Sequence, residues 1–156
     1  MSSYAQFTSE APDLAAAVRA RFEAHLHHVL ATLRADGSPR VSGTEARFFE
    51  GELYLGSMPG SRKAVDLHRD PRLALHAATI DVEMADGDAK VAGRAVVCDL
   101  DEASRFFASL GHPADPPDGE AFRLDITEAV LTKVDGDELV VLRWSPGSMP
   151  TEIRRK

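Results

Sequence analysis

A short basic loop is the clearest candidate for chemistry in this sequence. Ser61, Arg62 and Lys63 follow Gly60, and Ser61 is expected to cap a short helix that begins directly after it. The free N–H groups at the start of a helix, beside two cations, form a ready site for an anion. We therefore expect this loop to bind a phosphate-bearing ligand; the alternative is an ordinary solvated helix start with two surface cations.

No other segment of the chain carries a recognised catalytic signature. The sequence has no G-x-S-x-G, H-E-x-x-H, Walker or G-x-G-x-x-G motif. His25, His27 and His28 lie where a helix is expected to end, and histidines there complement the helix dipole, so we expect no metal site. A reaction, if the protein has one, is therefore expected to be carried by a cofactor.

Length and composition indicate one folded domain over residues 1–156. Hydrophobic residues make up 44% and charged residues 28% of the chain, as in ordinary globular proteins. The net charge of −7 argues against a general binder of nucleic acid or of anionic membranes. The single cysteine, Cys98, excludes an intramolecular disulfide, and we find neither a leader-like segment nor an apolar run of about 20 residues. We expect a soluble, cytoplasmic protein.

Before the basic loop, the sequence predicts one helix followed by three strands in an antiparallel meander. Apolar residues at every fourth position after Pro12 predict an N-terminal helix over residues 12–26. The period then changes to two, and Asp36-Gly37 is a strong signal for a hairpin turn. Strands are expected over about 28–33, 40–49 and 52–57.

The elements after the basic loop continue the β pattern. Gly93 indicates a bulge or a close backbone approach, and the Pro-rich segment 111–119 is expected to be a surface loop or a lid. Trp144 is expected to be a core residue at the end of the barrel. Helices are expected over 62–68 and 101–110, a polar loop over 80–88, strands over 72–78, 89–99, 121–126, 129–134 and 138–144, and a tail over 145–156.

This inventory predicts a mainly β fold. A closed or partly closed antiparallel barrel over 28–144 with a few peripheral helices accommodates it, because closure removes exposed strand edges. A sandwich is the alternative.

Several motifs between Leu30 and Ala95 resemble one protein family. They are the hairpin from Leu30 to Ser42, Ser57 at the end of a strand, Ser61-Arg62-Lys63, and Arg69-Asp70-Pro71-Arg72, with Gly93-Arg94-Ala95 as a later V-x-G-x-A strand. In combination they resemble the pyridoxamine 5′-phosphate oxidase-like family of flavin- or deazaflavin-binding split β-barrels.

The resemblance implies an antiparallel split barrel that forms a homodimer, with the cofactor at the subunit interface. The cofactor would be FMN or, as the alternative, the deazaflavin coenzyme F-420, since both carry a phosphate. The site residues that it implies are Ser61, Arg62 and Lys63 at the cofactor phosphate, Ser57 beside it, Arg40 at the flavin, and Val41 and Ser42 bordering the ring through backbone groups.

Two departures separate this chain from the vitamin B6 oxidase itself. Glu45 stands where that oxidase carries a lysine, and no histidine follows His112, so the C-terminal Arg-x-His substrate motif is absent. We therefore expect a flavin-type oxidoreductase that transfers a hydride to a small organic acceptor other than a B6 phosphate. The alternatives are a non-catalytic protein that stores a flavin, a deazaflavin or haem, with His76 and His112 as candidate haem ligands, and a structural dimer.

Overall fold

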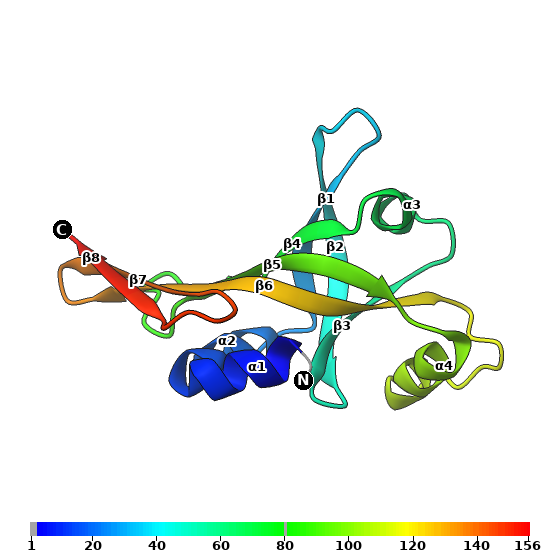
Figure 1. The fold of residues 1–156 in the computed structure, drawn as a ribbon, viewed down its shortest axis with the longest axis horizontal. Coiled ribbons are helices and arrows are strands. Elements are labelled where there is room, and N and C mark those ends of the chain that lie inside the picture. Colours follow the sequence, from blue (N-terminus) through cyan, green and yellow to red (C-terminus); the bar gives the residue numbers. More distant parts are fainter. Residues whose placement is uncertain (1–2, 80) are drawn as a thin grey trace.

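Six antiparallel strands close into a barrel at the centre of the molecule (Figure 1). The computed structural model describes residues 3–79 and 81–156. The order around the barrel is β3-β2-β1-β4-β5-β6, and pairing of β3 with β6 closes the ring. The strands are β1 His27–Leu33, β2 Pro39–Phe49, β3 Glu52–Ser57, β4 Arg72–His76, β5 Asp88–Val97 and β6 Glu120–Asp135. The mainly β, antiparallel barrel predicted from the sequence is confirmed.

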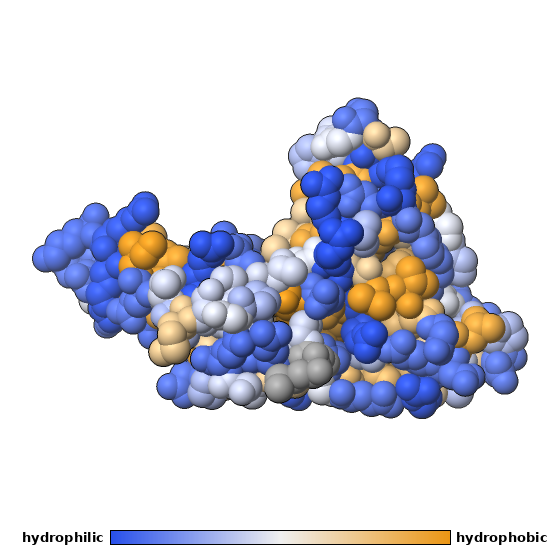
Figure 2. All heavy atoms as spheres, in the orientation of Figure 1, coloured by the Kyte–Doolittle hydropathy of each residue, from blue (hydrophilic) through white to orange (hydrophobic). Residues whose placement is uncertain are grey.

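Two further strands extend the sheet beyond the barrel. β7 (Glu138–Trp144) pairs with the second half of β6, and β8 (Thr151–Arg155) pairs with β7. We call β7 and β8 the arm. Figure 2 shows apolar side chains reaching the surface over the barrel, and a hollow between the β1–β2 hairpin and the arm. The last strand of the arm lies in the segment that the sequence marked only as a tail.

The described residues form four helices, which cover different parts of the barrel. They are α1 Ser3–Glu10, α2 Pro12–Glu23, α3 Arg62–Arg69 and α4 Leu100–Ser109. None of these helices is long and apolar enough to cross a membrane. The helix predicted over 12–26 ends earlier, at Glu23, and the loop predicted over 80–88 begins at Ile80, which lies outside the described residues.

The main core fills the barrel and continues under α1 and α2. Phe7 of α1 stacks on Trp144 with ring centroids 4.4 Å apart, and Trp144 is 1% exposed. The indole N–H of Trp144 donates to the carboxylate of Glu10 at 2.9 Å, so its polar group is satisfied. The core role predicted for Trp144 is confirmed, whereas helix α1 was not anticipated, although Tyr4, Phe7 and Ala11 have helical spacing.

One prediction about the sheet is wrong: residues 121–126 and 129–134 belong to a single strand, β6. Ala92 of β5 lies opposite Glu128, whereas Gly93 lies opposite Ile126, so Thr127 is an extra residue on β6. A bulge of this kind moves the following side chains to the other face. The residues of β6 in the main core therefore change from even numbers (Phe122, Leu124 and Ile126) to odd numbers (Ala129 and Leu131), and the two predicted strands are the two parts of β6 on either side of the bulge.

Gly93 lies at the point where this register shifts, as the sequence predicted. A Cβ atom added to Gly93 would lie 2.1 Å from the carbonyl oxygen of Asp125 on β6. Only glycine permits the two backbones to approach so closely. This contact holds the middle of β5 against the bulged strand.

Candidate functional site

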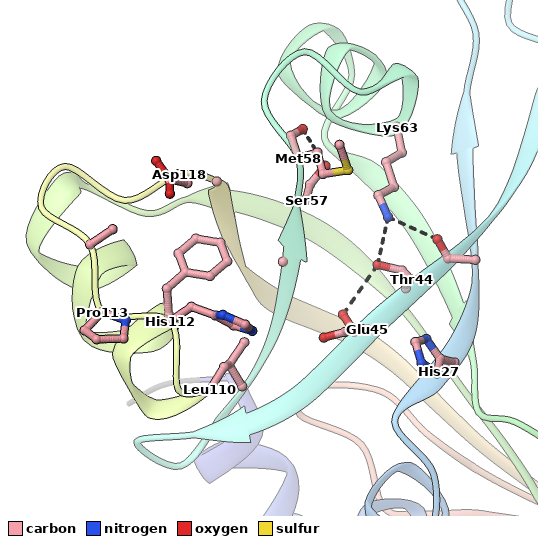
Figure 3. Close-up of a pocket in the computed structure, with 15 residues that line it drawn as sticks. His27, Thr44, Glu45, Ser57, Met58, Lys63, Leu110, His112, Pro113 and Asp118 are labelled. Atoms are coloured by element: carbon pink, nitrogen blue, oxygen red, sulfur yellow. Dashed lines mark hydrogen bonds between the residues drawn. The ribbon is translucent and has the colours of Figure 1, made fainter.

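A pocket of about 600 Å³ lies between the barrel and the loop that follows α4 (Figure 3). Strand β2 contributes Gly43, Thr44 and Glu45, and β3 contributes Gly56 and Ser57. The first turn of α3 reaches one end of the pocket, and the end of α4 with the Pro-rich loop forms the opposite side. A pocket of this volume is of the size that takes small molecules and cofactors.

Two serine hydroxyls meet at the start of α3. Ser61 caps the helix, because its Oγ accepts the backbone N–H of Ala64 at 3.3 Å. The Oγ of Ser57, at the end of β3, lies 2.5 Å from the Oγ of Ser61. The cap predicted from the sequence is confirmed, and the barrel brings a second hydroxyl to it from a different element.

Lys63 places a cation in the pocket that Ser57 also lines. Its ammonium donates to the carbonyl of Gly43 at 3.0 Å and to the hydroxyl of Thr44 at 3.4 Å. Partial burial lowers the pKa of Lys63, while the nearby carboxylate of Glu45 acts in the opposite direction. Within the described part of the chain no carboxylate forms an ion pair with Lys63. This end of the pocket can therefore accept an anion.

Arg62 and Arg40 lie in a different place from Lys63. Both line a second pocket of about 330 Å³, together with Arg34 and Arg69. Successive residues of a helix point about 100° apart, so Arg62 and Lys63 face different surfaces. The structure therefore brings together Ser57, Ser61 and Lys63, whereas the two arginines lie apart from them.

The remaining predicted site residues lie on β2 between these two pockets. Val41 is 70% exposed on the outer surface of the barrel, and Ser42 is half-buried. Neither side chain lines either of the two pockets.

Asp66 is the charged residue that the sequence reasoning overlooked. It is 2% exposed on α3 and accepts hydrogen bonds from Thr32 at 2.8 Å, from Arg40 at 2.6 Å and from Arg69 at 3.0 Å. Burial alone would raise its pKa, but these three donors outweigh burial and lower the pKa to about 2. In the sequence, the signal that could have revealed this role was the position of Asp66 on the buried face of a helix predicted to pack on the barrel.

The side of the pocket opposite Lys63 is partly apolar. Phe107 and Leu110 come from the end of α4, and His112, Pro113 and Asp118 come from the Pro-rich loop. Phe106 packs into the protein, stacked on Tyr54 at 5.2 Å. Phe107 and Leu110 pack against the same small core and also line the pocket.

The comparisons with known proteins agree with this fold. Residues 14–133 match the family model described as pyridoxamine 5′-phosphate oxidase. No curated protein matches the chain.

Three solved structures illustrate the structural similarity. PhzG from Burkholderia lata 383, in complex with tetrahydrophenazine-1-carboxylic acid, is 16% identical with a TM-score of 0.69, over 96% of this chain and 91% of that one. A pyridoxamine 5′-phosphate oxidase-related, FMN-binding protein from Nostoc punctiforme PCC 73102 is 14% identical with a TM-score of 0.63, and the match covers 94% of this chain and 96% of that one. General stress protein 26 from Bacillus anthracis str. Sterne is 16% identical with a TM-score of 0.59, and the match covers 74% of this chain and 91% of that one.

Proposed function

The chain belongs to the pyridoxamine 5′-phosphate oxidase family, and from this premise we propose that it is a flavin-type oxidoreductase. It would bind FMN, or alternatively the deazaflavin F-420, and transfer a hydride between the reduced cofactor and a small organic acceptor. The observation that carries this proposal is the group formed by Ser57, Ser61 and Lys63 at one end of a 600 Å³ pocket.

The residues present fit a cofactor phosphate. Ser57 and Lys63 both line the pocket, and the Oγ of Ser61, at the start of α3, lies 2.5 Å from the Oγ of Ser57. Such donors are complementary to a phosphate dianion. Gly43 and Gly56 leave the adjoining strands without side chains at two points, and a Cβ added to Gly43 would meet nothing within 4 Å. A flat ring would therefore have room to approach the backbone of β2.

Each residue would have a limited role. Lys63, Ser57 and Ser61 would hold and orient the phosphate, whereas for Arg62, which lines the second pocket, a phosphate contact is implied by the family resemblance alone. Val41 and Ser42 would border the ring through backbone groups, whereas for Arg40, which is paired with Asp66 in the second pocket, a flavin contact is implied by the family resemblance alone. The bound cofactor itself would supply the hydride chemistry. Water or a group on the Pro-rich loop would supply the proton.

We also propose that the protein is a homodimer with the cofactor at the interface. Val41, Ala31, Ala74 and Ala92 are register partners across β2, β1, β4 and β5, and they form an apolar row on the outside of the barrel. Val41 is 70% exposed in the single chain. A large exposed apolar side chain in such a row favours burial against a second copy. The cytoplasmic location expected from the single cysteine stays a prediction.

The alternative function is storage of a cofactor without turnover. The same phosphate contacts would serve storage and catalysis. The structure gives no support for haem ligation by His76, because its Nε2 lies 3.0 Å from Asp88 Oδ1 and its Nδ1 lies 2.7 Å from the carbonyl of Ala77. Both ring nitrogens of His76 already have protein partners.

Absorption and fluorescence titrations with FMN and with F-420 test the proposal directly. We expect one of them to bind stoichiometrically per chain, and the reduced form to be consumed in the presence of a panel of enones and quinones. Binding without consumption of any acceptor would favour the storage protein. Failure to bind either cofactor would leave only the structural dimer.

A further inference from the structure

The pocket presents unlike surfaces at its two sides. Lys63 and the serine hydroxyls lie at the end that would hold the cofactor phosphate. Across from them, the side chains of Leu110 and His112 point over the pocket toward β2, where Glu45 lies (Figure 3). A second ligand beside the cofactor would therefore contact Glu45 on one side and the end of α4 on the other.

The Phe107 ring is held firmly in the wall of this part of the pocket. A Cβ added to Gly119 would lie 2.6 Å from the ring, and one added to Gly56 would lie 3.4 Å from it. Phe107 also packs against Phe106, with ring centroids 5.4 Å apart. Because the ring is fixed by backbone on one side and by an aromatic neighbour on another, it offers a rigid apolar surface that favours a flat ring compound.

Apart from Lys63, the charged groups that line the pocket are mainly negative. Lys63 is the single lysine or arginine among the described residues that line the pocket, whereas Glu45 and Asp118 both carry carboxylates; two histidines, His27 and His112, also line it. Neither carboxylate forms a hydrogen bond or an ion pair within the described residues. Once a cofactor phosphate is paired with Lys63, two unpaired carboxylates remain beside the space for the acceptor.

We propose that this pocket selects planar, apolar ring compounds that carry no anionic group, and that Glu45 is the residue that enforces this selection. The inference rests on the proposed function, which places the cofactor phosphate at Lys63. Glu45 lines the same pocket as Lys63, so an acceptor that lies beside the cofactor in this pocket would come close to the Glu45 carboxylate. A carboxylate, phosphate or sulfonate on the acceptor would be repelled there.

The test uses two probes of the same ring skeleton, 1,4-naphthoquinone and 1,4-naphthoquinone-2-sulfonate. Their dissociation constants are measured by fluorescence quenching on the protein loaded with oxidised cofactor, so that the difference in their reduction potentials does not enter. We expect the uncharged quinone to bind at least tenfold more tightly. Glu45→Gln should reduce this preference, and Glu45→Lys should reverse it.

Asp137→Lys is the matched control. It makes the same change of charge on the exposed turn between β6 and β7, away from the pocket, and should leave the preference unchanged. Circular dichroism and cofactor titration of each variant verify that fold and cofactor site are retained.

The possible failures are distinguishable. If the parent protein binds neither cofactor, the probes are titrated into the protein without cofactor, and a retained preference for the uncharged probe would overturn the proposed function alone. Normal cofactor binding with equal affinity for the two probes, with tighter binding of the sulfonate, or with no binding of either, would overturn the inference.

Discussion

The Nε of Arg40 donates to the Oδ2 of Asp66 at 2.6 Å, where the end of the β1–β2 hairpin meets helix α3. The sequence had marked Arg40 as a contact for the flavin. In the folded chain its guanidinium forms an ion pair with a carboxylate that is nearly inaccessible to water. Arg69 and Thr32 complete the hydrogen bonds of this carboxylate, so the group joins β1, β2 and α3.

Asp66→Asn should destabilise the protein by about 3 kcal/mol, because it leaves two arginines without their buried counter-charge. Urea unfolding followed by circular dichroism measures this loss. Asp70→Asn is the control, since Asp70 pairs with the mostly exposed Arg72 and its loss should cost less than about 1 kcal/mol. Equal and small losses in both variants would show that the Asp66 group contributes little to stability.

Protonation of His28 should destabilise the protein in mild acid. His28 is 3% exposed, its Nδ1 accepts the backbone N–H of Ala78 at 3.0 Å, and its Nε2 is buried without a partner among the described residues. Burial lowers its pKa from the ordinary value of 6.5. The folded-state pKa of His28 is below its unfolded-state pKa. The stability that neutral His28 contributes is therefore complete above about pH 6.5 and is lost as the pH falls below that value.

Urea unfolding at pH 8, 7, 6 and 5.5 measures the effect. The slope from this one proton cannot exceed about 1.4 kcal/mol per pH unit. His28→Asn keeps an acceptor for Ala78 but does not titrate, so its stability should vary less over the same range. A parent and variant with parallel pH profiles would rule out His28 as the cause.

Lys63→Ala should weaken cofactor binding at least tenfold and leave the fold intact. A charged hydrogen bond contributes roughly 1.5 to 3 kcal/mol, which corresponds to about ten- to a hundredfold in affinity. Fluorescence titration with the cofactor gives the dissociation constants, and Lys156→Ala, at the exposed C-terminus, serves as the control. Superimposable titration curves for Lys63→Ala and the parent would remove this residue from the site.

Gly93→Ala should destabilise the barrel by about 3 kcal/mol, because the new methyl group would meet the carbonyl of Asp125 and force β5 and β6 apart. Gly43→Ala is the matched control on another strand, since its added Cβ lies in open space. Thermal unfolding of both variants without cofactor makes the comparison. If Gly93→Ala unfolds at the parent's temperature, the close approach of the two strands does not constrain the barrel.

Local patterns in the sequence were enough to predict most of the elements and one part of the site. The Asp36-Gly37 turn, the alternation of β1 to β3 and the Ser61 cap depend on residues close together in the chain, and the structure contains all three. The family motifs likewise lie in one continuous half of the sequence. Helix α1 has a weaker signal, because its burial depends on contact with the distant Trp144.

Only the tertiary structure decided how these residues are grouped. Helical geometry turns Arg62 away from Lys63, and Asp66 holds Arg40 at the end of the barrel, so the predicted basic site is divided between two pockets. The bulge at Thr127 and the position of α4 and the Pro-rich loop across the pocket from β2 depend on pairing between strands far apart in the sequence. The sequence determined which residues can carry charge or cap a helix, and closure of the barrel determined which of them face one another, because that depends on long-range contacts that no local pattern encodes.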